Sequence, residues 1–421
     1  MRWVYSVAWW LALPLVFGRL WWRGRQEPGY RQHLAQRLGL FGTSSPRPSA
    51  SVIWVHAVSV GETRAAEPLI DALLQTYPHH IIVLTHMTPT GRATGQALFG
   101  HQARVTQCYL PYDIGAMVGR FLAHFAPVVC ILMETEVWPN VMRQCARRRV
   151  PVLLANARMS ARSLAKGQRL AALMTDAARA LTCVAAQTEA DAQRLRLLGA
   201  VNVQVTGNIK FDVTPPDSAQ RAGAAWRAQS GPRPVLLCAS TRDGEEALIL
   251  DALAALDVGN LLLVIVPRHP QRFDAVARLI AGRGLSLARR STLGPQPLSH
   301  DVRVLLGDSM GEMFAYHAAC DVAFIGGSLL PLGGQNLIEA CAMGKPVLIG
   351  PHTFNFAAIS EDAVEAHAAW RVADATMLLA QAMRLLHDDQ QRLRMGASAR
   401  AFAALHRGAT VRTMALLQPL I

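Results

Sequence analysis

The stretch that most constrains the fold is 322–356, where two apolar runs enclose two glycine pairs. Val322 to Ile325 has the composition of a buried strand and ends at the first pair, 326–327. The second pair, 333–334, precedes a segment of helical composition, Leu337 to Met343, and Pro346 to Ile349 predicts the next strand. Strand, glycine loop, helix and strand in this order predict one half of a nucleotide-binding α/β unit.

The glycines before this helix favour a binding function. Glycine lets the backbone approach a ligand closely, and a helix N-terminus offers free N–H groups and a positive dipole end to an anion. Glu339 lies about one turn into the expected helix, where a carboxylate can accept hydrogen bonds from a ribose diol. The spacing is neither GxGxxG nor that of a P-loop, so a glycine-rich turn in any parallel-sheet protein is the alternative.

The rest of the chain repeats the alternation of strand and helix. Apolar runs predict strands over Val52–Val55, Ile81–Thr85, Val128–Leu132, Val150–Ala155, Cys183–Ala186, Pro234–Ala239, Leu261–Val266 and Val302–Leu305. Strands separated by helices predict parallel sheets covered on both faces, here two Rossmann-like α/β domains with a cleft between them. In a chain of 421 residues we place an N-terminal segment at 1–40, domains at 41–212 and 233–395, a linker at 213–232, and a C-terminal helix at 396–421 that returns to the first domain.

The seven cysteines are scattered, mostly within apolar runs, and form no CxxC pair or Cys/His cluster. This pattern indicates neither a zinc site nor a disulfide framework, and it fits a reducing compartment.

The net charge of +13 bears on partners rather than on fold. Residues 1–40 hold six arginines and one acid, and residues 141–170 hold eight basic residues and no acid. Such clusters suit nucleic acid, anionic lipid or a phosphorylated substrate. No recognition-helix or RNP-type motif accompanies them, so we expect no nucleic-acid partner. For 141–170 the alternative is a solvated helix face.

The apolar run from Trp3 to Trp22 has about the length of a membrane-spanning helix. Its tryptophans suit an interfacial belt, and the arginines that follow predict a cytoplasmic location for the body of the protein. Pro14 and Arg19 weaken a spanning helix, so a helix lying in the membrane interface competes with it, and a core helix of the first domain is the third possibility. No small-residue cleavage site follows, which disfavours a removed signal peptide.

Polar residues follow many of the predicted strands, at the sheet edge where open α/β proteins bind ligands. Glu62 on a tight turn could be a general base or a helix-start residue favoured by the dipole. Glu134 and Glu136 could shift each other's pKa, or simply begin a helix. Lys210 could stabilise a leaving-group phosphate, although a surface lysine is the commoner role.

Similar candidates follow the strands of the second half. Arg268 could hold a phosphate through its planar fork, whereas His269 suits a structural role better. Met310, Gly311 and Glu312 follow a further strand and precede the stretch at 322–356.

Taken together, these motifs resemble the 3-deoxy-D-manno-octulosonic acid (Kdo) transferase family of lipopolysaccharide synthesis. The resemblance runs in order across nearly the whole chain and rests on residues 56–62 (HAVSVGE), 87–91 (MTPTG), 110–113 (LPYD), 133–140 (METEVWPN), 155–160 (ANARMS), 207–212 (GNIKFD), 267–270 (PRHP), 333–336 (GGQN) and 350–356 (GPHTFNF).

The resemblance implies a GT-B glycosyltransferase with an acceptor domain followed by a donor domain. It implies CMP-Kdo as donor substrate, no metal or other cofactor, and the tetraacylated lipid A precursor lipid IVA as acceptor, at the cytoplasmic side of the inner membrane. Glu62 would accept the proton, and Glu134 and Lys210 would stabilise the transition state. The CMP contacts would come from Pro267, Arg268, Met310, Gly311, Glu312, Asn336, Leu337, Ile338, Glu339 and Ala340.

Two alternatives stay open. One is a GT-B transferase that uses another nucleotide sugar, with altered contacts near Arg268 and Glu312. The other is a non-catalytic lipid- or nucleotide-binding protein of the same fold. The number of Kdo residues transferred is not encoded in these motifs.

Overall fold

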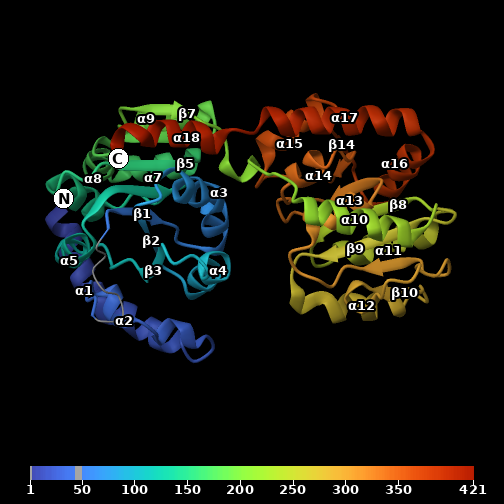
Figure 1. The fold of residues 1–421 in the computed structure, drawn as a ribbon, viewed down its shortest axis with the longest axis horizontal. Coiled ribbons are helices and arrows are strands. Elements are labelled where there is room, and N and C mark those ends of the chain that lie inside the picture. The colour runs from blue at the N-terminus through green and yellow to red at the C-terminus, as the bar shows by residue number, and fades with distance from the viewer. Residues whose placement is uncertain (1, 43–49) are drawn as a thin grey trace. The chain divides into compact units, whose positions relative to one another are not determined.

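The computed structural model describes residues 2–42 and 50–421, which form two compact units (Figure 1). Unit 1 runs to Asp212 and also includes Arg407–Ile421. Unit 2 comprises Val213–His406. Each unit is built on one parallel seven-stranded sheet, as the alternating pattern predicts.

The sheet of unit 1 has the strand order β3-β2-β1-β4-β5-β6-β7. Its central strand β1 is buried along its whole length, and β4 is buried at all but one residue, because helices cover both faces. The strands are β1 (Val52–His56), β2 (Ile81–His86), β3 (Val105–Tyr109), β4 (Pro127–Met133), β5 (Val152–Ala157), β6 (Cys183–Ala186) and β7 (Val203–Val205).

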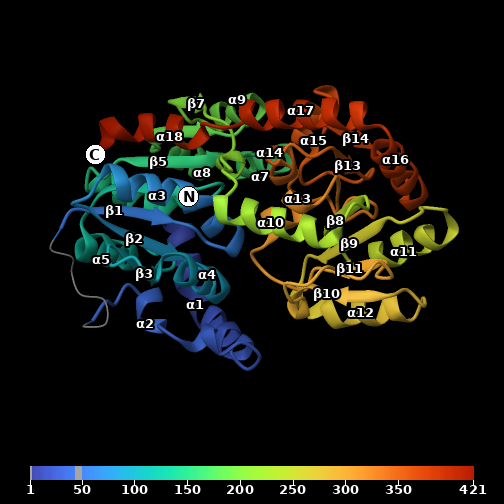
Figure 2. The ribbon, with the colours of Figure 1, turned by 45° about the vertical axis from the view of Figure 1, so that its right-hand side comes forward.

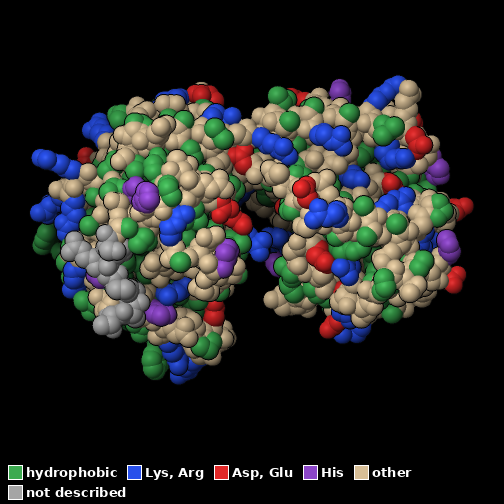
Figure 3. All heavy atoms as spheres, viewed as in Figure 1, with side chains coloured by type: hydrophobic (Ala, Val, Ile, Leu, Met, Phe, Trp, Pro, Cys, Tyr) green, Lys and Arg blue, Asp and Glu red, His purple; other side chains and the backbone are tan. Residues whose placement is uncertain are grey.

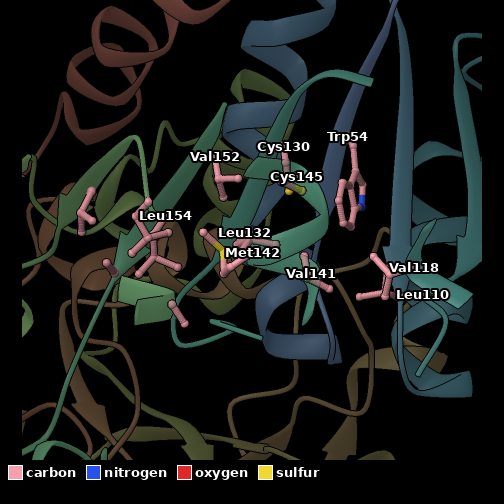
Figure 4. Close-up of a cluster of buried hydrophobic side chains, with 14 of the residues drawn as sticks. Trp54, Leu110, Val118, Cys130, Leu132, Val141, Met142, Cys145, Val152 and Leu154 are labelled. Atoms are coloured by element: carbon pink, nitrogen blue, oxygen red, sulfur yellow. The ribbon is translucent and has the colours of Figure 1, made fainter. Parts of the chain in front are cut away.

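Two apolar layers hold these helices to the sheet. One layer lies between the sheet and α5 (Gly115–Phe125), α6 (Pro139–Arg147), α8 (Ala171–Arg179) and α9 (Glu189–Leu198). Figure 4 shows part of this layer, with Trp54 of β1 and Leu132 of β4 near Val141 of α6. The other layer lies against α3 (Val60–Thr76), α4 (Pro89–Phe99) and α18 (Ala409–Leu417).

The N-terminal helix α1 (Arg2–Arg23) lies on unit 1 with one face only. Tyr5 donates its hydroxyl to Asp113 Oδ2 at 2.9 Å, and the ring of Trp9 stacks on Tyr112 at a centroid distance of 5.8 Å. Its other face exposes large apolar side chains: Trp3, Val4, Trp10, Leu11, Leu15, Trp21 and Trp22. A core helix does not expose such a face. The span Trp3–Arg23 has a mean hydropathy of 1.3 and is 6% buried, so by length and composition it is a candidate membrane segment.

Short elements join α1 to the first strand. They are a 3-10 turn at Pro28–Arg31 and α2 (Leu34–Arg37). Arg37 is buried, lies over the ring of Tyr109 at 3.8 Å, and donates to the carbonyl of Met87. The N-terminal segment expected at 1–40 is therefore partly built into unit 1.

The sheet of unit 2 has the order β10-β11-β9-β8-β12-β13-β14. Its strands are β8 (Val235–Thr241), β9 (Leu262–Pro267), β10 (Leu287–Arg289), β11 (Val304–Leu306), β12 (Val322–Ile325), β13 (Val347–Ile349) and β14 (Ala369–Arg371), which can be followed in Figure 2. One face packs on α11 (Glu245–Ala255), α12 (Phe273–Ala281) and α16 (Ala375–His387). Unit 2 also contains α13 (Met313–Ala319), α14 (Ile338–Ala342), α15 (Ala357–Glu365) and α17 (Asp389–Leu405). Unit 1 also contains α7 (Ala161–Arg169).

Two segments differ from the sequence-based expectation. The stretch 213–232, expected as a linker, contains helix α10 (Asp217–Ser230), which packs against α13 within unit 2. Gly223 allows this approach, because a Cβ there would collide with Ala318 and with the carbonyl oxygen of Ala315. The expected C-terminal helix at 396–421 is two helices: α17 ends at Leu405 in unit 2, and α18 belongs to unit 1.

Candidate active site

In unit 1 the strand order reverses between β1 and β4, and the two loops that follow these strands carry the candidate carboxylates. Glu62 follows β1, and Glu134 and Glu136 follow β4. Such a switch point is where open α/β sheets bind ligands, because the loops diverge there and leave a crevice at the carboxyl edge.

Glu62 lies in the first turn of α3, and its carboxylate turns back toward the loop. It accepts hydrogen bonds from the N–H of Val58 at 2.6 Å and from the hydroxyl of Ser59 at 3.3 Å. Glu62 therefore helps to start helix α3, which agrees with the second of its two predicted roles, a residue at the start of a helix. Burial raises the pKa of Glu62 to about 7 despite the Val58 bond, and the charges of Glu136 and Glu134 raise it further.

Glu134 is buried, and its carboxylate forms ion pairs with two basic side chains. Lys210 Nζ lies 2.6 Å from its Oε1, and Arg158 Nε lies 3.0 Å from its Oε2. Glu134 has φ +57°, a left-handed conformation that costs a non-glycine residue free energy and is often found at functional sites. Its N–H is bonded to the carbonyl of Ala155 in the neighbouring strand β5.

The position of Lys210 is set by two asparagines. Asn156 Oδ1 accepts from the N–H of Ile209 at 3.0 Å, and Asn208 Oδ1 accepts from the N–H of Lys210 itself at 3.0 Å. These bonds fix the 3-10 turn Ile209–Phe211 at the end of β6 and β7. The structure thus brings Lys210 to Glu134. It adds Arg158, which the sequence analysis included in the basic segment and in the motif 155–160 but not among the candidate site residues.

Glu136 is held by an aromatic neighbour. Trp138 Nε1 donates to Glu136 Oε2 at 2.6 Å, and the ring of Trp138 lies edge-on to His56 at a centroid distance of 6.0 Å. Burial and the nearby charge of Glu134 raise the pKa of Glu136. Burial lowers the pKa of His56 to about 3, so this histidine is neutral and packs rather than titrates.

In unit 2 the strand order reverses between β8 and β12, and the glycine loop follows β12. Gly327, Gly333 and Gly334 all have positive φ, at 70°, 93° and 76°. Added side chains would be strained at these angles. Glu245 of α11 fixes the loop, since its carboxylate accepts from the N–H groups of Gly327 at 2.6 Å and Leu329 at 2.9 Å. The sequence reasoning missed Glu245, whose only signal was its place just after a strand.

The helix after the glycine loop is shorter than the sequence predicts. It begins at Ile338 rather than Leu337, so Glu339 lies in its first turn. Asn336 Oδ1 accepts from the N–H of Ile338 at 3.1 Å and so occupies one of the free donors of the helix start. Of the five candidate residues here, Leu337, Ile338 and Ala340 are buried, whereas Asn336 and Glu339 are partly exposed.

The other donor-side candidates follow β9 and β11. Pro267 ends β9, and the exposed Arg268 donates its N–H to the carbonyl of Thr241 in β8. Met310 is 59% exposed, and Gly311 has φ +82°. Glu312 is partly buried and pairs with Arg290 at 2.9 Å, and the guanidinium of Arg290 lies 4.3 Å from the ring of Trp226.

Within residues 2–42 and 50–421, no three or more His, Cys, Asp and Glu side chains are grouped so as to hold a metal ion. The seven cysteines are all buried, and none forms a disulfide.

Comparison with known proteins identifies the family. The family model for 3-deoxy-D-manno-octulosonic-acid transferase (kdotransferase) matches residues 32–213. The chain is 45% identical to the 3-deoxy-D-manno-octulosonic acid transferase of Bordetella pertussis, over 99% of both chains. This chain belongs to the Kdo transferase family. The enzyme of Haemophilus influenzae, another member, is 37% identical over 99% of this chain and 98% of its own.

Solved structures agree on the architecture. HepE of Anabaena in complex with UDP has a TM-score of 0.58 at 16% identity, covering 88% of this chain and 99% of that one. UDP-GlcNAc 2-epimerase of Neisseria meningitidis has a TM-score of 0.59 at 16% identity, covering 87% and 100%. At such low identity the likeness concerns the fold alone, and the predicted fold class of two Rossmann-like domains is confirmed.

Proposed function

We propose that this Kdo transferase is an inverting, metal-independent enzyme that moves Kdo from CMP-Kdo to the tetraacylated lipid A precursor lipid IVA during lipopolysaccharide core synthesis. The observation that carries the proposal is Glu62, a largely buried carboxyl group at the switch point of unit 1 whose pKa is raised to about 7. A carboxylate with this pKa can take a proton from an attacking hydroxyl at neutral pH.

In the proposed reaction, the acceptor hydroxyl attacks the anomeric carbon of Kdo while Glu62 removes its proton. The bond to CMP breaks on the opposite side, so the configuration inverts and the phosphate of CMP takes the electron pair. Lys210, held by Glu134 at 2.6 Å, supplies positive charge that is already in place when negative charge develops. Preorganised charge of this kind needs no metal ion to stabilise a phosphate leaving group.

The donor contacts are proposed for unit 2. Arg268 is exposed and can bind a phosphate, and Glu339 in the first turn of α14 can accept from a ribose hydroxyl. The proposed CMP site is completed by the last residue of β9 and by residues that follow β11 and β12, some of them in α14: Pro267, Met310, Gly311, Glu312, Asn336, Leu337, Ile338 and Ala340.

We further propose that the enzyme works at the cytoplasmic face of the inner membrane, with α1 as its anchor. The exposed apolar face of α1 supports an interfacial helix, because its opposite face is engaged with Tyr112 and Asp113. A helix with one face on the protein and one apolar face outward can lie along the bilayer surface.

The direct test incubates purified enzyme with CMP-Kdo and lipid IVA, in the presence and absence of EDTA, and analyses the lipid product by mass. We expect one or more added Kdo residues, release of CMP, and no loss of rate with EDTA. Transfer only from UDP-sugars would overturn the donor. Glu62→Gln is expected to keep CMP binding and to lower kcat by roughly 10²–10⁴-fold. Undiminished transfer by this variant would remove Glu62 from its role.

A further inference from the structure

An apolar groove lies on unit 1 beside the loop that carries the candidate carboxylates. Its volume is about 270 Å³, and its walls come from α1, the loop after β4, the first residue of α6, and α8 with the residue before it. Trp9 belongs to α1, Trp138 to the loop after β4, and Leu173 and Met174 to α8. Leu170, which is 51% exposed, stands at the start of α8. Almost all of the lining is apolar, which suits a hydrocarbon chain rather than a sugar.

A second groove of about 450 Å³ adjoins the first, and Pro139 and Leu173 line both. This second groove lies between α6 and α8 and carries two arginines, Arg143 and Arg147, against one acid, Asp176. Both arginines are exposed. Figure 3 shows Lys and Arg side chains gathered along the edge of unit 1 where Figure 1 places α8 and the N-terminal end. An apolar slot that continues into a basic one matches a lipid with an acidic head group.

Trp138 connects the grooves to the catalytic loop. Its side chain lines the apolar groove, and its Nε1 donates to Glu136 Oε2 at 2.6 Å. Glu136 in turn lies two residues from Glu134 and contributes to the charge around Glu62. A ligand in the groove would therefore contact the loop that carries Glu134 and Glu136.

We propose that these two adjoining grooves are the acceptor subsite, with one acyl chain of the acceptor lipid in the apolar groove and one of its phosphates on Arg143 and Arg147. The inference rests on the proposed function and names the part of unit 1 that takes the acceptor. The occupant is the acceptor rather than a bilayer phospholipid, because Trp138, which lines the apolar groove, belongs to the loop that carries Glu134 and Glu136, where a bystander lipid would interfere with the reaction.

The test uses two variants. Met174→Trp fills the apolar groove, and the double variant Arg143→Ala with Arg147→Ala removes the positive charge of the second groove. Matched controls are Leu197→Trp, at an exposed leucine outside the groove, and Arg162→Ala, at an exposed arginine of α7. Steady-state kinetics are measured with lipid IVA and CMP-Kdo. Co-sedimentation is measured with phosphatidylglycerol vesicles that do or do not contain lipid IVA.

We expect Met174→Trp and the arginine pair each to raise KM for lipid IVA at least about tenfold, with little change in KM for CMP-Kdo. Both should also lose the additional vesicle binding that lipid IVA confers, whereas the controls behave as wild type. An unchanged KM and unchanged lipid IVA-dependent binding would overturn the inference. Equal loss of binding to vesicles without lipid IVA would overturn it in favour of a phospholipid site.

Failure of the proposed function gives a different result. In that case wild-type enzyme transfers no Kdo to lipid IVA, while the vesicle assay still reports whether the grooves bind this lipid. Wild-type enzyme without transfer and without lipid IVA-dependent binding would overturn both proposals.

Discussion

Lys210 Nζ lies 2.6 Å from Glu134 Oε1, although the two residues are 76 positions apart in the chain. Glu134 is buried and Arg158 occupies its other oxygen, so the carboxylate is fully engaged by cations. Removing one partner of such a buried pair leaves the other charge poorly compensated. We therefore expect the two side chains to act as one unit.

The first prediction follows from this pairing. Lys210→Ala and Glu134→Gln should each lower kcat/KM by about 10²–10³-fold, and the double variant should be no worse than the more damaging single one. Lys166→Ala, at an exposed lysine of α7, is the control and should retain wild-type kinetics. Losses that simply add in free energy would show that the two side chains act independently.

A second prediction concerns the return of the chain to unit 1. The carboxylate of Asp212 accepts hydrogen bonds from the N–H groups of Gly408, Ala409 and Thr410 at the start of α18. Asp212→Ala should lower the free energy of unfolding by about 1–2 kcal/mol, the usual range for a lost helix cap. Urea unfolding measures this, with Asp217→Ala in the first turn of α10 as the control. An unchanged midpoint would mean that water replaces the cap without cost.

Much of the fold was predictable because the central strands are continuous apolar runs. The observed strands β6 and β12 have the predicted bounds, since polar or glycine residues flank both runs. The edge strands β7, β10 and β14 have three residues each and bury few of them, so they carry almost no pattern. Helix α10 was not predicted for another reason: the prolines and polar residues before it are typical of a linker.

The candidate site was predictable as separate residues but not as a geometry. Glu62, Glu134 and Lys210 were identified from strand ends and from family motifs, whereas the bond between Glu134 and Lys210 depends on β5, β6 and β7 lying side by side. Asp113 shows the same limit. Its carboxylate accepts from the N–H groups of Asn140 and Val141 and so begins α6, a contact between segments that no local pattern reveals.

A third prediction concerns the two faces of α1. Leu11 and Leu15 are 74% and 78% exposed, so Leu11→Lys combined with Leu15→Lys should move the enzyme from vesicles to the supernatant. The free energy of unfolding should stay within about 0.5 kcal/mol, because neither side chain packs on unit 1. Leu197→Lys, at another exposed leucine, is the control for added charge. Unchanged sedimentation of the double variant would exclude this face as the membrane contact.

A fourth prediction concerns pH. Burial raises the pKa of Glu62 to about 7, and a general base must be deprotonated, so kcat/KM should rise as pH increases through about 7. The folded state holds this proton more tightly than the unfolded state, so the Glu62 contribution to stability falls between about pH 4.5 and 7. Glu62→Gln should therefore stabilise the protein above pH 7, by on the order of 1 kcal/mol. Equal pH dependence of unfolding in both proteins would contradict the raised pKa.

The last prediction separates the neighbouring carboxylates. The charge of Glu136 contributes to the raised pKa of Glu62, and Trp138 holds the Glu136 carboxylate in place by its indole N–H. Glu136→Gln removes the charge and keeps an oxygen that can accept from Trp138. The acidic limb of the kcat/KM profile should then shift to lower pH, because Glu62 loses a like charge and ionises more readily. Glu67→Gln, elsewhere on α3, is the control and should leave the limb in place. A limb that shifts to higher pH, or does not move, would show that the charge of Glu136 does not raise the pKa of Glu62.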